Sequence, residues 1–120
     1  MKALSIKQPW AWLIVEGFKT IENRSWPTRQ RGTILIHAGK GMTRAEYEEA
    51  RNLADTLGVK VPAFEALERG GIVGQATITG CVTESESAWF FGAYGFTLAD
   101  AKPLPFEPYR GQLGFFEVQN

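Results

Sequence analysis

The chain has 120 residues, of which 44% are hydrophobic and 22% charged, and its net charge is zero. This composition predicts a single globular domain over residues 1–120 and excludes a collagen, a coiled coil and a disordered chain. The longest apolar stretch, Trp10 to Val15, is far shorter than the roughly 20 residues that cross a bilayer, so we expect no membrane partner. The single cysteine, Cys81, allows no internal disulfide and no cysteine-based metal cage. We therefore expect a cytoplasmic protein with no metal and no cofactor.

The positive charge of the chain is concentrated in its first third. Residues 1–40 carry seven basic and two acidic side chains, a net charge of +5, which residues 41–120 balance with −5. Three of the four tryptophans lie in the same segment. Basic patches with interleaved aromatic residues are typical of nucleic-acid contact. The alternative is that these side chains are scattered around a barrel and are simply solvated.

The hydrophobic pattern of the first forty residues predicts three strands and one helix. A strand over 2–7 precedes a helix that begins at Pro9 and ends at Gly17, since proline favours the first turn and glycine the end of a helix. Because this helix is apolar nearly all round, we expect it to be buried. Strands at 20–25 and 32–38 follow, separated by a loop over 27–32.

The sequence after residue 40 predicts further helices and strands. Thr43 and Glu46 form a capping box for an amphipathic helix that ends at Gly58, and a short helix is expected over 62–69. A long strand over 72–82 contains two glycines that suggest bulges. Closing strands are expected at 96–98 and 111–118, joined by a linker over 103–108. The pattern predicts an α+β fold, a small mixed or antiparallel barrel of about six strands with two or three flanking helices.

An unusual cluster of charged and aromatic side chains occupies residues 17–26. If residues 20–26 are extended, the period of two places Glu22, Arg24 and Trp26 on one face, with Lys19 at its mouth and Asn23 on the other face. A charged face beside an aromatic ring suits a polyanionic or base-bearing ligand. Arg24 is the candidate phosphate anchor, because its planar fork matches phosphate geometry. Lys19 and Glu22 are either a catalytic pair or an ordinary ion pair.

Other aromatic residues and the single histidine have two interpretations each. Trp89 lies with Phe90 and Phe91 in a loop over 83–95, where the rings either form a platform for a base or close one end of the barrel. Trp10 poses the same choice. For His37 a hydrogen-bonded core position is favoured over a metal ligand or a base.

The first forty residues also carry a recognisable motif. The pattern G-x-K-x-x-E-x-R is met at Gly17, Lys19, Glu22 and Arg24, after the tripeptide Gln8-Pro9-Trp10. It resembles the ASCH family, named for homology to the activating signal cointegrator, and is most similar to its coactivator-type branch and the bacterial and phage relatives.

This resemblance implies a PUA-like β-barrel whose cleft, lined by Lys19, Glu22 and Arg24, holds RNA or another nucleic acid. Gln8, Trp10 and Trp26 would adjoin that cleft. One branch of the family hydrolyses the acetyl amide of acetylated cytidine with a lysine and a threonine three residues later. This chain has Glu22 at the threonine position.

The leading hypothesis is a nucleic-acid-binding module, with RNA favoured, that uses a basic and aromatic cleft. Its predicted contacts are Lys19, Arg24, Trp26, Gln8, Trp10, Arg29, Arg31, Lys40 and Trp89. The alternative is a small hydrolase of modified nucleosides or RNA phosphodiesters, with Glu22 as base and Lys19 as its electrostatic partner. A domain that binds a protein partner is a third alternative, and the oligomeric state is left open.

Overall fold

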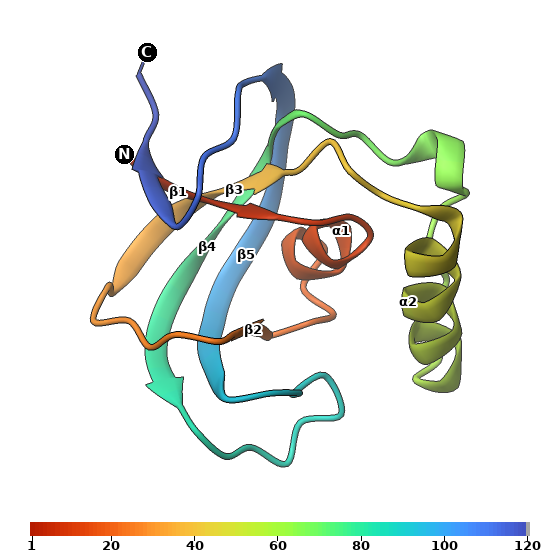
Figure 1. The fold of residues 1–120 in the computed structure, drawn as a ribbon, viewed down its shortest axis with the longest axis horizontal. Coiled ribbons are helices and arrows are strands. Elements are labelled where there is room, and N and C mark those ends of the chain that lie inside the picture. The colour runs from red at the N-terminus through yellow and green to blue at the C-terminus, as the bar shows by residue number, and fades with distance from the viewer. Residues whose placement is uncertain (120) are drawn as a thin grey trace.

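A computed structural model of the chain describes residues 1–119 and confirms the α+β fold (Figure 1). The elements in chain order are β1 (Lys2–Ile6), α1 (Trp10–Val15), β2 (Ile21–Arg24), β3 (Gly32–Ala38), α2 (Arg44–Thr56), the 3-10 helix η1 (Phe64–Ala66), β4 (Gly71–Val82), β5 (Tyr94–Pro108) and β6 (Phe115–Glu117).

All six strands belong to one curved sheet that forms a half-barrel. Their order is β2-β5-β4-β3-β1-β6, so β2 and β6 are the edge strands. β1 and β3 are parallel, whereas every other neighbouring pair is antiparallel. A parallel pair needs a long crossover connection, and here that connection carries α1 and β2. The motif-bearing segment is therefore the link between two central strands of the sheet.

Helix α1 lies against the inner face of the curved sheet (Figure 1). Ala11, Ile14 and Val15 pack in the main core with residues of β1, β3, β4 and β5, as the all-round apolar sequence predicts. The helix ends before Gly17, whose φ of 85° reverses the chain toward β2. The chain therefore continues from the end of this short helix through Lys19 into β2, at the open side of the half-barrel.

Helix α2 stands beside the sheet and begins with the predicted capping box (Figure 1). The Oγ1 of Thr43 accepts a hydrogen bond from the Glu46 amide at 3.1 Å, and Glu46 Oε1 accepts one from the Thr43 amide at 2.8 Å. Ala54 joins the helix to the rest of the molecule through a cluster with Leu13 and Trp89. This packing holds α2 against α1 and the loop that carries Trp89.

Two predictions about the C-terminal third are wrong. Residues 103–108, predicted as a linker, continue β5 and pair with β4 as far as Gly71 and Pro108. Prolines are tolerated there because β2 pairs only with Tyr94–Thr97, which leaves the rest of β5 without a neighbour on that side. The last strand, predicted over 111–118, is only Phe115–Glu117, so residues 111–114 and Val118 lie outside β6.

No helix within residues 1–119 combines the length and the apolar character needed to cross a membrane.

Gly74 is required where α1 packs on the sheet. A register shift between β4 and β5 occurs at this residue, as the strand glycines predict. A Cβ at position 74 would lie 2.5 Å from Val15 Cγ1 and 2.5 Å from the Lys102 carbonyl oxygen, so the helix and β5 would have to move apart. At Gly41, in contrast, a Cβ would meet nothing within 4 Å.

We therefore expect Gly74→Ala to lower the free energy of unfolding by about 2 kcal/mol or more, the usual cost of overpacking. Gly41→Ala, the matched control, should change it by less than about 0.5 kcal/mol. Urea unfolding monitored by tryptophan fluorescence measures both values. Equal stability of the two variants would contradict the close packing of α1 on β4.

Candidate functional site

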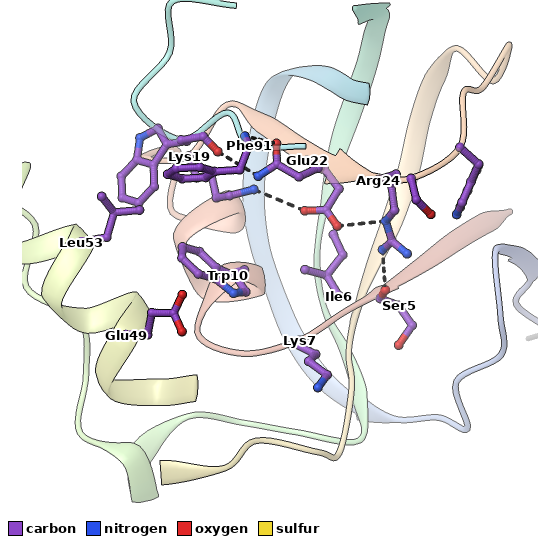
Figure 2. A pocket seen from close by; sticks show the side chains of 14 residues that line it. Ser5, Ile6, Lys7, Trp10, Lys19, Glu22, Arg24, Glu49, Leu53 and Phe91 are labelled. Atoms are coloured by element: carbon purple, nitrogen blue, oxygen red, sulfur yellow. Dashed lines mark hydrogen bonds and ion pairs between the residues drawn. The ribbon is translucent and has the colours of Figure 1, made fainter. Parts of the chain in front are cut away.

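A hollow of about 730 Å³ opens between β1, α1, β2 and α2 (Figure 2). We call it the Arg24 pocket. It brings together three charged residues of the motif and four aromatic side chains. These are Trp10 of α1, Trp26 just after β2, and Trp89 and Phe91 of the loop before β5. Its lining residues are Ser5, Ile6, Lys7, Trp10, Lys19, Glu22, Asn23, Arg24, Ser25, Trp26, Glu49, Leu53, Trp89 and Phe91.

Glu22 joins the two motif cations on one side of this pocket (Figure 2). Its Oε1 lies 3.3 Å from Lys19 Nζ, and its Oε2 accepts a hydrogen bond from Arg24 Nε at 3.0 Å. Glu22 and Arg24 therefore share a face of β2, as the period of two predicts. Both carboxylate oxygens of Glu22 are occupied by cations of the same chain.

Lys19 is buried rather than placed at the mouth of the face, and this differs from the prediction. Its side chain is 3% exposed, and Nζ also donates a hydrogen bond to the Ile21 carbonyl. Burial lowers the pKa of Lys19 below its ordinary value, because desolvation disfavours the charged ammonium, and the charge of Glu22 opposes this shift. Lys19 is thus held by short-range partners within the wall of the Arg24 pocket.

Arg24 is the motif cation that reaches the open space. Its side chain is 20% exposed, and its Nη2 donates a hydrogen bond to the Ser5 carbonyl at 2.7 Å. These bonds fix the guanidinium plane while other N–H donors of the group remain for a ligand. The guanidinium carbon also lies 5.8 Å from the centre of the Trp26 ring. Arg24 therefore presents an oriented, partly desolvated donor group to the pocket.

The aromatic lining divides into anchored rings and one exposed ring. Trp89 turns inward, with 8% exposure, and meets Trp10 edge to face with ring centres 6.5 Å apart. Trp26 packs edge to face on Phe96 at 5.3 Å while it lines the pocket. Phe91 is 58% exposed. The loop rings therefore divide between the two predicted arrangements. Trp89 packs inward, whereas the Phe91 ring is exposed and lines the pocket.

Asn23 holds the loop that carries these rings. Its side-chain amide donates to the Trp89 carbonyl at 2.9 Å, and its Oδ1 accepts a hydrogen bond from the Phe91 amide at 3.0 Å. Sequence reasoning placed Asn23 on the face opposite Glu22 and assigned it no role. Its partner lies 66 residues away in the chain, so no local pattern could have revealed the contact.

The other predicted contact residues are dispersed. Gln8 is buried, and its Oε1 accepts a hydrogen bond from the Trp12 amide. Its side chain therefore bonds a backbone N–H in the first turn of α1. Arg29 and Arg31 are exposed in the loop before β3 and do not line the Arg24 pocket. Lys40 lies at a second hollow together with His37. Only part of the basic first third therefore converges on the Arg24 pocket.

Lys7 and Ser5 line the pocket as well, although sequence reasoning assigned neither a role. Lys7 is exposed at the end of β1 and forms an ion pair with Glu46 at 2.7 Å. The contribution of Ser5 is its backbone carbonyl, which carries no sequence signal. Within residues 1–119, no group of three or more histidine, cysteine, aspartate or glutamate side chains is arranged to hold a metal ion.

Comparison with known proteins agrees with the motif. The ASCH domain matches residues 4–113 of this chain. The chain is also similar to activating signal cointegrator 1 of Mus musculus, with 34% identity over 85 residues. This match covers 69% of this chain and 15% of the mouse protein. Activating signal cointegrator 1 of Homo sapiens is 54% identical over 35 residues, 29% of this chain and 6% of the human protein. The chain thus spans only a small part of the length of these relatives.

Glu22→Gln should destabilise the protein strongly, because it leaves the Lys19 ammonium buried without its counter-charge. We expect the free energy of unfolding to fall by roughly 3 kcal/mol at pH 7, as for other broken buried pairs. Glu49→Gln, which removes an exposed carboxylate from the same pocket, should change it by less than about 0.5 kcal/mol.

The loss in Glu22→Gln should shrink as the pH rises. The folded variant holds Lys19 with a still lower pKa, so between that pKa and the ordinary value of 10.5 the unfolded chain binds more protons than the folded one. Stability therefore increases with pH in this window, and more in the variant than in the wild type. Urea unfolding at pH 7 and pH 9.5 measures the difference, and a loss that stays constant or grows would contradict the role of Glu22.

Proposed function

This chain belongs to the ASCH domain family, and from this premise we propose that it is a nucleic-acid-binding module whose ligand is single-stranded RNA. The observation that carries the proposal is the position of Arg24, whose guanidinium is oriented by Glu22 and Ser5 at the side of an aromatic-lined pocket. Proteins that read single-stranded RNA stack unpaired bases on aromatic rings and hold phosphates with arginine.

The size and lining of the Arg24 pocket support a single base as occupant. At about 730 Å³ it falls within the range of pockets for small ligands. The Phe91 ring is exposed at the pocket and is not part of the core, so it can stack on a base with no loss of core packing. An unpaired base with its phosphate would match both the ring and the guanidinium, whereas a base inside a duplex could not enter.

The free donors of Arg24 support an anionic ligand. Three cations, Lys7, Lys19 and Arg24, line the pocket together with two carboxylates, Glu22 and Glu49. Lys7 is paired with Glu46, and Lys19 is buried against Glu22, so Arg24, which keeps unused N–H donors, is the cation that meets a ligand. The free thiol of Cys81 is consistent with a reducing, cytoplasmic setting, which is part of this proposal.

A hydrolase is the second candidate, and the lowered pKa of Lys19 favours it. Against it stand the two ion pairs of Glu22, because both carboxylate oxygens are already bound to cations of the same chain and neither is free to contact a substrate. The threonine that serves other members of the family is also replaced by Glu22.

Incubation of the protein with RNA and with N4-acetylcytidine, followed by mass spectrometry, tests the second candidate. We expect the strand and the acetyl group to remain intact, with and without Mg²⁺. Turnover that Arg24→Lys retains and Glu22→Gln abolishes in folded protein would make the chain an enzyme instead.

Phe91→Ala tests the binding proposal without disturbing the core. The Phe91 ring is exposed, and the hydrogen bond to Asn23 uses its backbone, so the fold should persist. We expect the affinity for a fluorescein-labelled single-stranded RNA to fall about tenfold, since loss of one stacked base costs ~1–3 kcal/mol. Fluorescence anisotropy over a salt series measures the change.

Phe18→Ala is the matched control, because Phe18 is exposed to 47% and lies outside the Arg24 pocket. This variant should bind as tightly as the wild type. Equal binding by Phe91→Ala and the wild type would rule out base stacking in this pocket, and absence of salt-sensitive RNA binding by the wild type would rule out the function itself.

A further inference from the structure

A second hollow of about 990 Å³ shares the lining residue Ser5 with the Arg24 pocket. We call it the Lys40 groove. Lys40 and Arg110 are its charged lining residues, together with Ser5, His37 and Tyr109, and no carboxylate lines it. Lys40 and Arg110 are exposed, and no ion pair joins either to an acidic side chain in the described part of the chain. The groove is therefore wholly cationic.

Ser5 belongs to both hollows and connects their side chains. Its carbonyl accepts the hydrogen bond from Arg24, and its Oγ lies 2.9 Å from His37 Nδ1. His37 Nε2 lies 2.7 Å from the Tyr109 carbonyl oxygen, which can only accept, so Nε2 donates this hydrogen bond. Hydrogen bonds thus connect Arg24 through Ser5 and His37 to Tyr109, the residue before Arg110.

The backbone on both sides of the groove is held in place. A Cβ at Gly111 would lie 2.7 Å from His37 Cε1, so this segment packs directly on the histidine ring. On the opposite side, the Lys40 carbonyl accepts a hydrogen bond from Arg69 Nη1 at 2.7 Å. The two cations are therefore mounted on fixed backbone on either side of one groove.

We propose that an RNA strand whose base occupies the Arg24 pocket continues over Ser5 into the Lys40 groove, where Lys40 and Arg110 bind its phosphates. This inference rests on the proposed function and adds a second binding site to it. The groove has cations but no aromatic ring apart from the tyrosine and histidine that hold its backbone, so it suits the sugar-phosphate chain rather than a second stacked base. Arg110 has no part in the family motif and was not predicted from the sequence.

Oligouridylates of three and twelve nucleotides, labelled with fluorescein, separate the two sites. We expect Lys40→Ala with Arg110→Ala to weaken binding of the twelve-mer about tenfold or more at low salt. The slope of log affinity against log salt should fall by about 1.4, the value for two lost phosphate contacts on a single strand. The three-mer, which fills only the Arg24 pocket, should bind with less than about a twofold change.

The control is Lys60→Ala with Lys102→Ala, which removes the same charge from exposed positions outside both hollows. It should leave both oligonucleotides bound as by the wild type, and urea unfolding should confirm that all variants are folded. Equal losses in the two double variants would reduce the effect to net charge and overturn the inference.

The outcomes also separate this inference from the proposed function. If the Lys40→Ala, Arg110→Ala double variant binds the twelve-mer with the affinity of the wild type, only the second site is overturned. Failure of the wild type to bind either oligonucleotide overturns both proposals. Tighter binding of duplex DNA than of the twelve-mer, dependent on Lys40 and Arg110, would overturn the single-strand path.

Discussion

The carboxylate of Glu22 binds Lys19 through one oxygen and Arg24 through the other, and it does so where little water reaches. Without this carboxylate the ammonium of Lys19 and the guanidinium of Arg24 would be removed from water with no counter-charge, and burial of an unpaired charge is costly. The pair of bonds also sets the plane of the Arg24 guanidinium, which in turn reaches the Ser5 carbonyl of β1. One acidic side chain thereby orients the arginine that links the edge strand β2 to β1, near the other end of the strand order.

The same bonds indicate what the site can do. A carboxylate with both oxygens in ion pairs is a structural anion, and a buried lysine bonded to a carbonyl is poorly placed to reach a substrate. Arg24 keeps donors beside the half-buried ring of Trp26, and this combination suits the flat, anionic ligand that we propose. Binding follows more directly from the geometry than bond cleavage does.

Sequence reasoning succeeded where the physics is local. The capping box at Thr43, the face shared by Glu22 and Arg24, and the strand glycines of β4 all follow from spacing within a few residues. It failed where a distant segment decides the outcome. The length of β5 depends on its pairing with β4, which continues as far as Gly71 and Pro108. The different positions of Trp89 and Phe91 depend on the hydrogen bonds of their backbone to Asn23.

The parallel pairing of β1 with β3 places the whole motif inside the connection between two adjacent strands. These strands cannot align until the connection has closed, because parallel neighbours leave no room for a tight turn. Its closure brings α1 onto the sheet and β2 onto β5. We therefore expect the pocket and the sheet to form in the same cooperative step, so that partial unfolding that spares the sheet would not erase the pocket.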